Sequence, residues 1–340
     1  MTRAFGPGRV NLIGEHTDYN DGLCLPFPIA AGVTVELGDG DDAIVRARAD
    51  DLGETDEFDV GDPPPAEGWR AFVRGTVAEL RREGHVLRGG ELSFSGDVPR
   101  GSGLSSSAAL EVALALALLA HAGEPEPDRL ALARVCSRVE NEWVGAQTGL
   151  LDQLASLLGR EGYAIRLDVR TLDVRPVPLE LGDWRLATLD SGVEHTHAGS
   201  GYNERRQECA AACEALGIAS LRDADAGAAT ALPEPLGRRV RHVVEENARV
   251  DAAVAALRAG DLEALGRLLD ASHASLRDNY EVSVPEVEAT VERLAAAGAA
   301  GARIMGGGFG GAVLALFPPG ATPPDDAVAV APGPPARVLG

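Results

Sequence analysis

The chain has 340 residues, of which 45% are hydrophobic and 24% are charged, a composition that is ordinary for a soluble globular protein with room for two domains. Its net charge of −21 argues against sequence-independent nucleic-acid binding, which needs a basic surface. All 31 basic residues are arginines. Because Walker A loops, protein kinases and pyridoxal phosphate enzymes each need a lysine, the composition excludes all three.

Neither a membrane segment nor a disulfide framework is expected. The longest apolar run, at residues 108–120, contains Glu111 and is too short to span a bilayer, and residues 1–10 lack a signal-peptide core. There is no CxxC motif, and Cys209 and Cys213, one helical turn apart, have no second Cys or His pair nearby to complete a zinc site. We expect free thiols in a cytoplasmic protein that contacts no membrane.

In chain order, the first third is expected to be rich in strands. The predicted strands are residues 9–13, 32–37, 43–48 and 91–94, with a helix at 69–82. Three helices follow, at 105–121, 128–144 and 150–158, and the first of them is apolar nearly all round and should be buried.

The second half begins with strands and becomes mostly helical. Its predicted strands are residues 162–168, 184–190, 302–305 and 312–317, and its predicted helices are 202–216, 236–258, 262–275 and 284–297. Strands and helices mix without strict alternation, which favours an α+β fold over a doubly wound sheet.

The first strand runs into a cluster of polar side chains. Arg9 lies at its start, and Glu15, His16, Asp18 and Tyr19 lie after it within the five positions 15–19. The simplest reading of this segment is a turn, because the residues 20–22 that end it, Asn-Asp-Gly, have good turn chemistry.

The segment 96–110, GDVPRGSGLSSSAAL, follows a strand and opens the buried helix. Gly101 and Gly103 let the backbone approach a ligand, and Ser105, Ser106 and Ser107 add hydroxyls and free N–H groups at a helix N-terminus. That end carries roughly half a positive charge, so the segment could bind phosphate without a lysine. A serine N-cap is the alternative, although it explains one serine more easily than three.

Two carboxylates occupy different positions on the next helices. Glu140 shares a helix face with Cys136 and Trp143, so it points inward, where a carboxylate must be paired with an arginine, neutralised or bound to a metal. Asp152 points away from the leucine stripe of its helix and lies in the first turn. There it either stabilises the helix dipole or serves in catalysis.

Residues 301–317, GARIMGGGFGGAVLALF, place five glycines and one phenylalanine between two strands. A hairpin needs only one or two glycines. The excess indicates a backbone that bends tightly and passes close to another group, with a loose hairpin turn as the alternative.

Three motifs thus stand in order, GRVNLIGEHTDY at 8–19, PRGSGLSSSAAL at 99–110 and GGGFGG at 306–311. They resemble the three motifs of the GHMP kinase superfamily, and the first resembles the galactokinase signature. Residues 149–159 and 201–209 are also galactokinase-like. The resemblance implies an N-terminal domain similar to ribosomal protein S5 domain 2, residues 1–180, a ferredoxin-like C-terminal domain, residues 181–340, and an active site between them.

Galactokinases use ATP and Mg²⁺ to phosphorylate the anomeric hydroxyl of D-galactose. By resemblance, Asp152 matches the catalytic aspartate and Arg9 matches the arginine that stabilises the transferring phosphoryl group. The matches to the Mg²⁺ ligands are Ser107 and Glu140. The matches to the sugar-lining positions are Glu15, His16, Asp18, Gly149 and Tyr202. The matches to the nucleotide phosphate loop are Gly101, Ser102, Gly103, Leu104, Ser105, Ser106 and Ser107.

Asp152 beside Arg9 is expected to stay ionised and to receive the proton of the sugar hydroxyl, either by full abstraction or mainly by orienting the hydroxyl. One departure from the family lies before the third motif. Ile304 and Met305 stand where relatives commonly carry Met-Thr, so a hydroxyl that could order the phosphates is missing.

Two alternatives to a galactokinase stay open. A related kinase of N-acetylgalactosamine or arabinose would share the three motifs, and a sugar panel would separate it. A catalytically inactive galactose sensor is disfavoured, because residues 105–109 are intact and Asp152 is present. We expect a monomer whose partners are galactose and ATP, with no nucleic acid.

Overall fold

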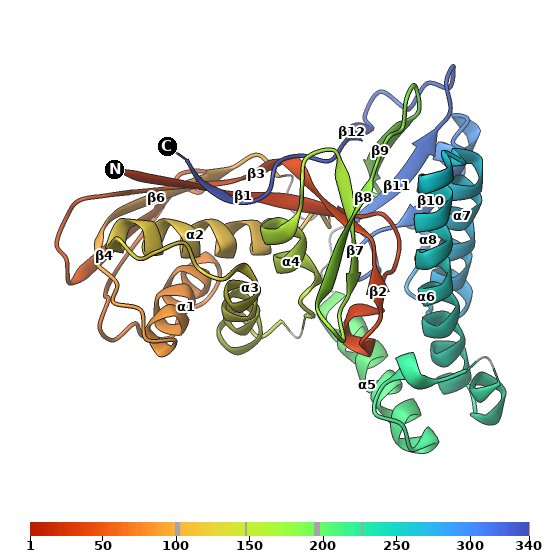
Figure 1. Cartoon of the computed structure of the whole chain (residues 1–340), viewed down its shortest axis with the longest axis horizontal. Helices are drawn as coiled ribbons and strands as arrows, with labels where there is room; N and C mark the ends of the chain where they lie inside the picture. The colour runs from red at the N-terminus through yellow and green to blue at the C-terminus, as the bar shows by residue number, and fades with distance from the viewer. Residues whose placement is uncertain (99–102, 147, 194–197, 226, 340) are drawn as a thin grey trace.

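The computed structural model describes residues 1–98, 103–146, 148–193, 198–225 and 227–339. Figure 1 shows an elongated molecule with one large sheet and its helices at one end, and a second sheet with long helices at the other. The two chain ends lie close together along the first sheet (Figure 1).

The first sheet has six strands in the order β13-β1-β3-β6-β4-β5. The strands are β1 (Thr2–Asn11), β3 (Pro26–Gly38), β4 (Ile44–Ala49), β5 (Glu54–Asp59), β6 (Gly90–Gly96) and β13 (Arg337–Leu339). Neighbouring strands are antiparallel except β4 and β6, which are parallel. A parallel pair needs a long crossover, and β5 with helix α1 (Trp69–Arg82) supplies it.

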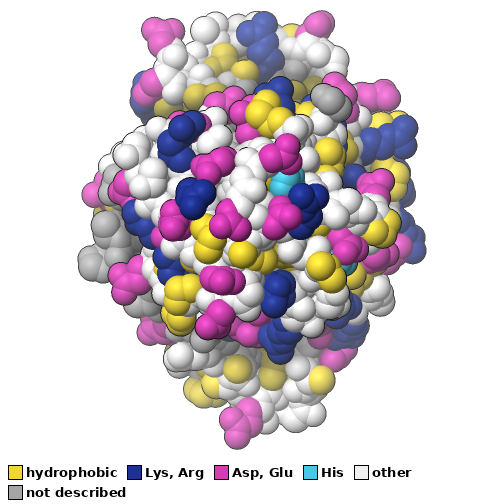
Figure 2. All heavy atoms as spheres, turned by 90° about the vertical axis from the view of Figure 1, so that its left-hand side faces the viewer, with side chains coloured by type: hydrophobic (Ala, Val, Ile, Leu, Met, Phe, Trp, Pro, Cys, Tyr) yellow, Lys and Arg dark blue, Asp and Glu magenta, His cyan; other side chains and the backbone are white. Residues whose placement is uncertain are grey.

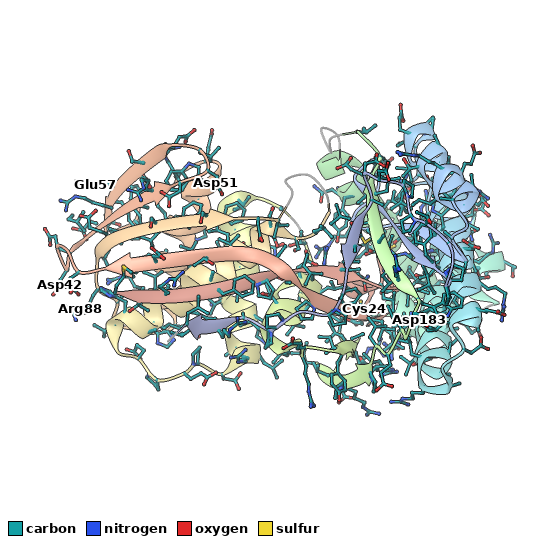
Figure 3. All side chains as sticks on the ribbon, turned by 90° about the horizontal axis from the view of Figure 1, so that it is seen from above. Cys24, Asp42, Asp51, Glu57, Arg88 and Asp183 are labelled. Atoms are coloured by element: carbon teal, nitrogen blue, oxygen red, sulfur yellow. The ribbon has the colours of Figure 1, made fainter. Side chains whose placement is uncertain are left out.

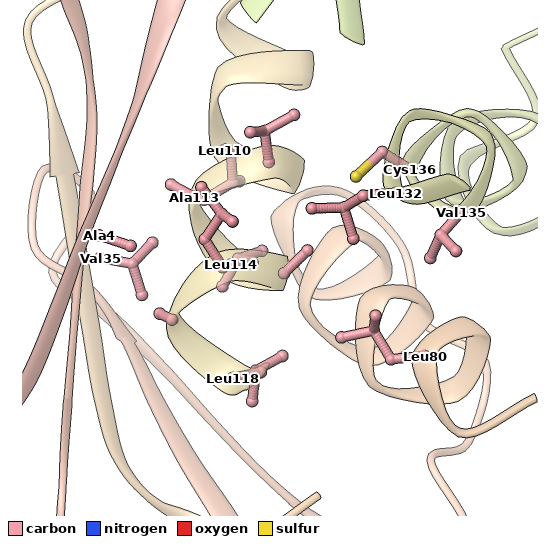
Figure 4. Packing of buried hydrophobic residues seen from close by; sticks show 14 of the residues in the cluster. Ala4, Val35, Leu80, Leu110, Ala113, Leu114, Leu118, Leu132, Val135 and Cys136 are labelled. Atoms are coloured by element: carbon pink, nitrogen blue, oxygen red, sulfur yellow. The ribbon is translucent and has the colours of Figure 1, made fainter. Parts of the chain in front are cut away.

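Helices α1, α2 (Ser106–Ala122) and α3 (Arg129–Arg138) cover one face of this sheet (Figure 1). Helix α2 is buried from residue 108 to 119, as its apolar composition predicts. Figure 4 shows its leucines between the sheet and the other two helices, with the labelled residues Ala4 and Val35 on the strands, Leu80 on α1 and Leu132, Val135 and Cys136 on α3. Each leucine buried in this way contributes about 1.5–3 kcal/mol.

A close approach of backbones sets the position of α2. A Cβ atom on Gly6 of β1 would overlap the carbonyl oxygen of Ala109 and lie 3.1 Å from the amide nitrogen of Ala113. Glycine at position 6 therefore lets α2 pack directly on the first strand, and it brings the N-terminus of α2 to the end of β1.

The second sheet has four antiparallel strands in the order β10-β11-β9-β12. These strands are β9 (Arg185–Asp190), β10 (Gly301–Ile304), β11 (Ala312–Phe317) and β12 (Val328–Val330). Helices α6 (Leu236–Ala259), α7 (Leu262–Asp278) and α8 (Pro285–Ala296) lie beside it, and α5 (Ala198–Leu216) contacts α6 (Figure 1).

A third, smaller sheet lies between the two halves. It consists of β2 (Leu23–Cys24), β7 (Tyr163–Asp168) and β8 (Asp173–Pro178), and helix α4 (Leu151–Leu158) precedes β7. Figure 3 shows Cys24 at this junction, far from Asp42 and Arg88 at the outer end of the first sheet. The polar cluster at residues 15–19, which follows the first strand, lies at this junction.

The predicted helices and strands are present with shifted ends, and the α+β class is confirmed. Periodicity missed the strands β2, β5, β8, β12 and β13. Three of these have only two or three residues, too few for a period to show, and the acidic β5 sequence ETDEFD has low strand propensity.

The helix predicted at 128–144 needs a correction. Helix α3 ends at Arg138, and the chain continues as a π-helical turn, Val139–Val144, which contains Glu140. A π-helix shifts the side chains that follow it relative to the 3.6-residue period, so a helical periodicity cannot reveal it.

The surface and the cysteines agree with the composition. Figure 2 shows acidic, basic and apolar side chains interspersed over one end of the molecule. All four cysteines are free, and Cys24, Cys136 and Cys209 are buried. Within the described residues, no helix has both the length and the apolar character to cross a membrane.

Candidate active site

The three motifs and the two candidate carboxylates meet around the end of β1. The backbone N–H of Arg9 donates to the carbonyl of Leu104 at 3.0 Å, which joins the first motif to the second. A Cβ atom on Gly306 would lie 3.9 Å from the Cα atom of Gly103, so the second motif touches the third. The meeting point is assembled from both halves of the chain.

Arg9 and Asp152 form a two-point ion pair. Arg9 Nε donates to Asp152 Oδ1 at 2.6 Å, and Nη2 donates to Oδ2 at 2.8 Å. Arg9 is buried, whereas the Asp152 side chain keeps 23% of its surface exposed. Asp152 therefore points away from the buried leucines of α4, as its place in the helix predicts, and it is open to a reacting group.

The start of α2 supports this pair. Ser105, just before the helix, has the left-handed backbone angles φ 62° and ψ 51°, and its hydroxyl donates to Asp152 Oδ2. Arg9 Nη1 donates to the carbonyl of Gly103. Leu104 is buried, so only its backbone is available to a ligand. Ser106 begins the helix, and Gly101 and Ser102 lie outside the described residues.

Ser107 and Glu140 converge on each other. Ser107 Oγ donates to Glu140 Oε1 at 2.9 Å, and Thr148 Oγ1 donates to Oε2 at 2.7 Å. Glu140 is buried as predicted. Burial and the nearby Asp152 carboxylate raise the pKa of Glu140, against the effect of its hydrogen bonds. These hydrogen bonds come from neutral groups, and within the part of the chain that the structure describes no arginine pairs with Glu140, so the ion pair considered from sequence is not found there.

Behind Glu140 lies a second buried carboxylate, Glu111 of α2. Gln153 Nε2 donates to Glu140 Oε2 at 2.9 Å and to Glu111 Oε2 at 3.2 Å. Burial and the neighbouring Glu140 raise the pKa of Glu111 well above its ordinary value. The surroundings of Glu111 therefore disfavour a second negative charge beside Glu140.

Glu15 joins the first motif to the strand before the third. Its Oε1 accepts from the backbone N–H of Gly306 at 2.9 Å and lies 2.8 Å from Arg303 Nη2. Arg303 is fully buried in β10, and its Nη1 donates to the carbonyl of Asn11 at 2.6 Å. The glycine run thus bends against the Glu15 carboxylate, which agrees with a tight backbone rather than a loose hairpin.

His16 lies in an aromatic cluster. Its ring centroid is 4.7 Å from Tyr280, 5.4 Å from Tyr202 and 5.9 Å from Tyr19. Its Nδ1 is 2.9 Å from Tyr19 Oη, which in turn is 2.9 Å from Tyr280 Oη. Burial lowers the pKa of His16 well below its ordinary value, and the nearby His242 adds to the effect. The imidazole is therefore neutral.

Asp18 and Gly149 are in direct contact. A Cβ atom on Gly149 would overlap Asp18 Oδ2, so the position accepts only glycine without moving the carboxylate. Burial, followed by the charges of Asp152 and Glu15, raises the pKa of Asp18 to about 7. Three carboxylates therefore share this small region.

Sequence reasoning missed four residues of this site, namely Arg303, Gln153, Glu111 and Tyr280. A signal was available for two of them. Arg303 is a charged residue inside a short apolar strand, and Glu111 interrupts an otherwise apolar helix. Both patterns mark a buried charge that needs a partner. Gln153 and Tyr280 carry no such local mark.

The family comparisons agree with this geometry. Residues 71–160 match the GHMP kinases N terminal domain, residues 253–331 the GHMP kinases C terminal domain, and residues 2–38 the galactokinase galactose-binding signature. The chain is 45% identical to a galactokinase of Roseiflexus sp. (strain RS-1) over 326 residues, which are 91% of this chain and 82% of the relative. It is 42% identical to a galactokinase of Streptomyces coelicolor, over 91% of this chain and 83% of the relative.

Solved structures give the same assignment. The crystal structure of Lactococcus lactis galactokinase complexed with galactose superposes with a TM-score of 0.91 at 34% identity, covering 99% of this chain and 95% of the other. Methanococcus jannaschii mevalonate kinase shares the fold, with a TM-score of 0.70 at 17% identity over 93% of this chain and 90% of the other. The sequence matches, the shared fold and the convergence of three motifs at one site lead to one conclusion: the chain belongs to the galactokinase family of GHMP kinases.

Proposed function

We propose that this protein is a galactokinase that transfers the γ-phosphoryl group of ATP to the anomeric hydroxyl of D-galactose, giving α-D-galactose 1-phosphate and ADP. The observation that carries this proposal is the placement of Glu15 and Asp18 of the polar cluster beside the Arg9–Asp152 pair. We further propose that residues 1–180 and 181–340 form two domains with the site between them.

The phosphates of ATP would bind at the N-terminus of α2, where unpaired backbone N–H groups and the helix dipole favour anions. Ser105, Ser106 and Ser107 stand at that end. This arrangement needs no lysine, in agreement with a chain that has none. Arg9 adds a permanent positive charge with fixed donors, suited to charge that develops on the transferring phosphoryl group.

Asp152 would orient the anomeric hydroxyl and accept its proton. Arg9 and Ser105 hold its carboxylate from one side, and the exposed remainder leaves room for the sugar. Phosphoryl transfer through a loose transition state needs proton transfer only late in the reaction, so correct placement of this carboxylate matters more than its basicity.

The residues present fit a Mg²⁺ ion. Ser107 Oγ and Glu140 Oε1 lie 2.9 Å apart, and hydroxyl and carboxylate oxygens are the hard ligands that Mg²⁺ prefers. The described residues contain no group of three His, Cys, Asp or Glu side chains that could enclose a metal. Such a pair of ligands suits an ion that keeps several waters and binds substrate phosphates, whose negative charge it would neutralise.

Sugar recognition would fall to Glu15, His16, Asp18, Gly149 and Tyr202. Carboxylates accept hydrogen bonds from the hydroxyls of a neutral polyol, and a site that bonds hydroxyls rejects analogues that lack them. Gly149 leaves space for Asp18, and the Tyr202 ring packs near His16.

The test is ADP release from the purified protein with ATP and Mg²⁺, measured against galactose, N-acetylgalactosamine, arabinose and glucose. We expect kcat/KM to be highest for galactose, and the product to carry phosphate on the anomeric oxygen by ³¹P and ¹³C NMR. A higher kcat/KM for another sugar would replace galactose as the substrate. Galactose binding without turnover would indicate a sensor.

A further inference from the structure

One face of helix α6 holds the backbone of the loop that carries the sugar-binding cluster. Glu246 Oε1 accepts from the N–H of Gly14 at 3.0 Å, and His242 Nε2 lies 3.1 Å from the carbonyl of Glu15. The next residue along α6, Asn247, accepts through its Oδ1 from the N–H of Leu23 at 2.7 Å. His242 and Glu246, four positions apart, share one helix face and bond the start of the loop at residues 14–23, and the adjacent Asn247 bonds its end.

Glu246 is the most constrained of the three. It is fully buried, and besides Gly14 it accepts from Ser272 Oγ of α7 at 2.6 Å and from Arg249 Nε at 2.6 Å. Burial opposes its charge, but Arg249, His242 and Arg303 outweigh that cost and lower its pKa to about 2. The buried, ionised Glu246 carboxylate thus accepts hydrogen bonds from one loop amide and from two neighbouring side chains.

His242 completes the arrangement as a neutral ring. Burial lowers its pKa to about 4, although Glu246 acts against this effect. Its Nδ1 is 2.9 Å from Ser275 Oγ. Because a carbonyl oxygen can only accept, Nε2 must carry the hydrogen that is donated to Glu15, and Nδ1 then accepts from Ser275.

The loop needs such support because its backbone is unusual. Gly14 has φ 98° and His16 has φ 61°, and a left-handed histidine is uncommon. A backbone in this state persists only where its surroundings hold it. The bonds to Gly14 N and Glu15 O fall on the two residues just before His16, so they set the direction in which the Glu15 and His16 side chains leave the chain.

We propose that Glu246, with His242, is a positioning residue for sugar recognition. It acts from the second half of the chain through the backbone of Gly14 and Glu15 rather than by contact with the reacting groups. The identity of the sugar rests on the proposed function above. The expected effect falls on sugar affinity, since the nucleotide side of the site is built from α2, which Glu246 does not hold.

The decisive variant is Glu246→Gln, which keeps the size of the side chain. The one oxygen that glutamine keeps would accept from Arg249, so the new NH₂ group would face the Gly14 N–H and the Ser272 hydroxyl. A donor would then stand opposite the Gly14 N–H, and the hydrogen bond to the loop would be lost. The matched control is Glu245→Gln. Glu245 is exposed on the same helix and also pairs with Arg249, at 3.3 Å, but lies outside the loop contact. His242→Phe is a second variant that removes the donor to Glu15.

We expect Glu246→Gln to raise KM for galactose by about tenfold, the worth of one hydrogen bond to a charged group, with KM for ATP within about twofold of the control. Amide hydrogen exchange read by mass spectrometry should show faster exchange in a peptide spanning residues 12–23 and unchanged exchange in α2. His242→Phe should show the same pattern if Glu246→Gln fails to fold.

Two results would overturn the inference. One is exchange at residues 12–23 that matches the Glu245→Gln control. The other is a loss in which KM for both substrates and exchange across the whole chain change together, as a general loss of stability would produce. The exchange measurement is made without substrate, so it tests the attachment of the loop even if the wild-type protein does not phosphorylate galactose, a result that would overturn only the proposed function.

Discussion

Arg9 at the start of the chain's first motif and Asp152 on α4 face each other with two parallel hydrogen bonds, of 2.6 and 2.8 Å, although 143 positions separate them. Two parallel hydrogen bonds between a guanidinium group and a carboxylate make a strong contact of defined orientation. The pair fixes the orientation of Asp152 and keeps a positive charge beside it, so in the proposed reaction Arg9 would position the proton acceptor and also face the phosphoryl group.

Asp152→Asn should lower kcat by about 100- to 10,000-fold, because an amide keeps the size of the side chain but cannot accept the proton. The fold should be retained, as measured by circular dichroism. Arg9→Lys should also lose most activity, because a point charge cannot reproduce the two-point contact. Near-normal turnover of Asp152→Asn would remove Asp152 from this role.

Gly149→Ala should raise KM for galactose, because the added methyl group overlaps Asp18 Oδ2 and moves the carboxylate. Steady-state kinetics against both substrates would check this. The matched control is Gly38→Ala in β3, where the nearest neighbour of a Cβ atom lies at 3.9 Å and the backbone needs no positive φ. Equal sugar affinity in the two variants would contradict the contact.

Asp18→Asn should raise the stability of the folded protein by an amount that depends on pH, and it should lower activity. The folded-state pKa of Asp18 is raised to about 7, so between the unfolded value of 3.8 and about 7 the folded protein holds a proton that the unfolded chain releases. Stability contributed by this proton is lost as the pH rises through that window. Asp18→Asn should therefore raise Tm most above about pH 7 and progressively less toward acid.

The same residue should shape the activity profile. In the wild-type protein, kcat/KM for galactose should rise as the pH passes about 7, where Asp18 ionises and becomes a full acceptor for a sugar hydroxyl. Asp18→Asn should be less active and lack this rise. A wild-type kcat/KM for galactose that does not change with pH across this range would show that Asp18 does not bind the sugar.

Glu140→Gln should raise the Mg²⁺ concentration needed for half-maximal activity by at least about tenfold. Without metal the variant should be no less stable than the wild type, because burial already disfavours the charge of Glu140. The control is Glu142→Gln, an exposed neighbour that pairs with Arg82. An unchanged Mg²⁺ titration in Glu140→Gln would contradict its assignment as a ligand.

Local patterns were sufficient for all the long helices, for most of the longer strands and for part of the site. The apolar composition of α2 predicted its burial, the inward face of Glu140 predicted a buried carboxylate, and the glycine run predicted a close backbone approach, found against Glu15. Each of these depends on neighbours within a few positions, where periodicity and turn chemistry carry information.

The contacts that complete the site join distant parts of the chain, and no local period reports them. Gly14 is 232 positions from Glu246, and Glu15 is 291 positions from Gly306. Helix α6 looks from sequence like an ordinary amphipathic helix, and its polar face gives no sign that it bonds a loop backbone. The π-helical turn at Glu140 was not predicted for a different reason: it breaks the 3.6-residue period on which helix prediction depends.

Because α6 bonds the loop after β1, that loop can take its final shape only after α6 has been synthesised. The first motif is translated early, but the groups that shape it, Glu246 and Arg303, emerge from the ribosome only after most of the chain has been made. A nascent chain that stops before α6 carries the motif without the geometry that recognises a sugar. A fragment ending before Leu236 should therefore bind no galactose by calorimetry, and prematurely terminated products should neither sequester the sugar nor consume ATP on it.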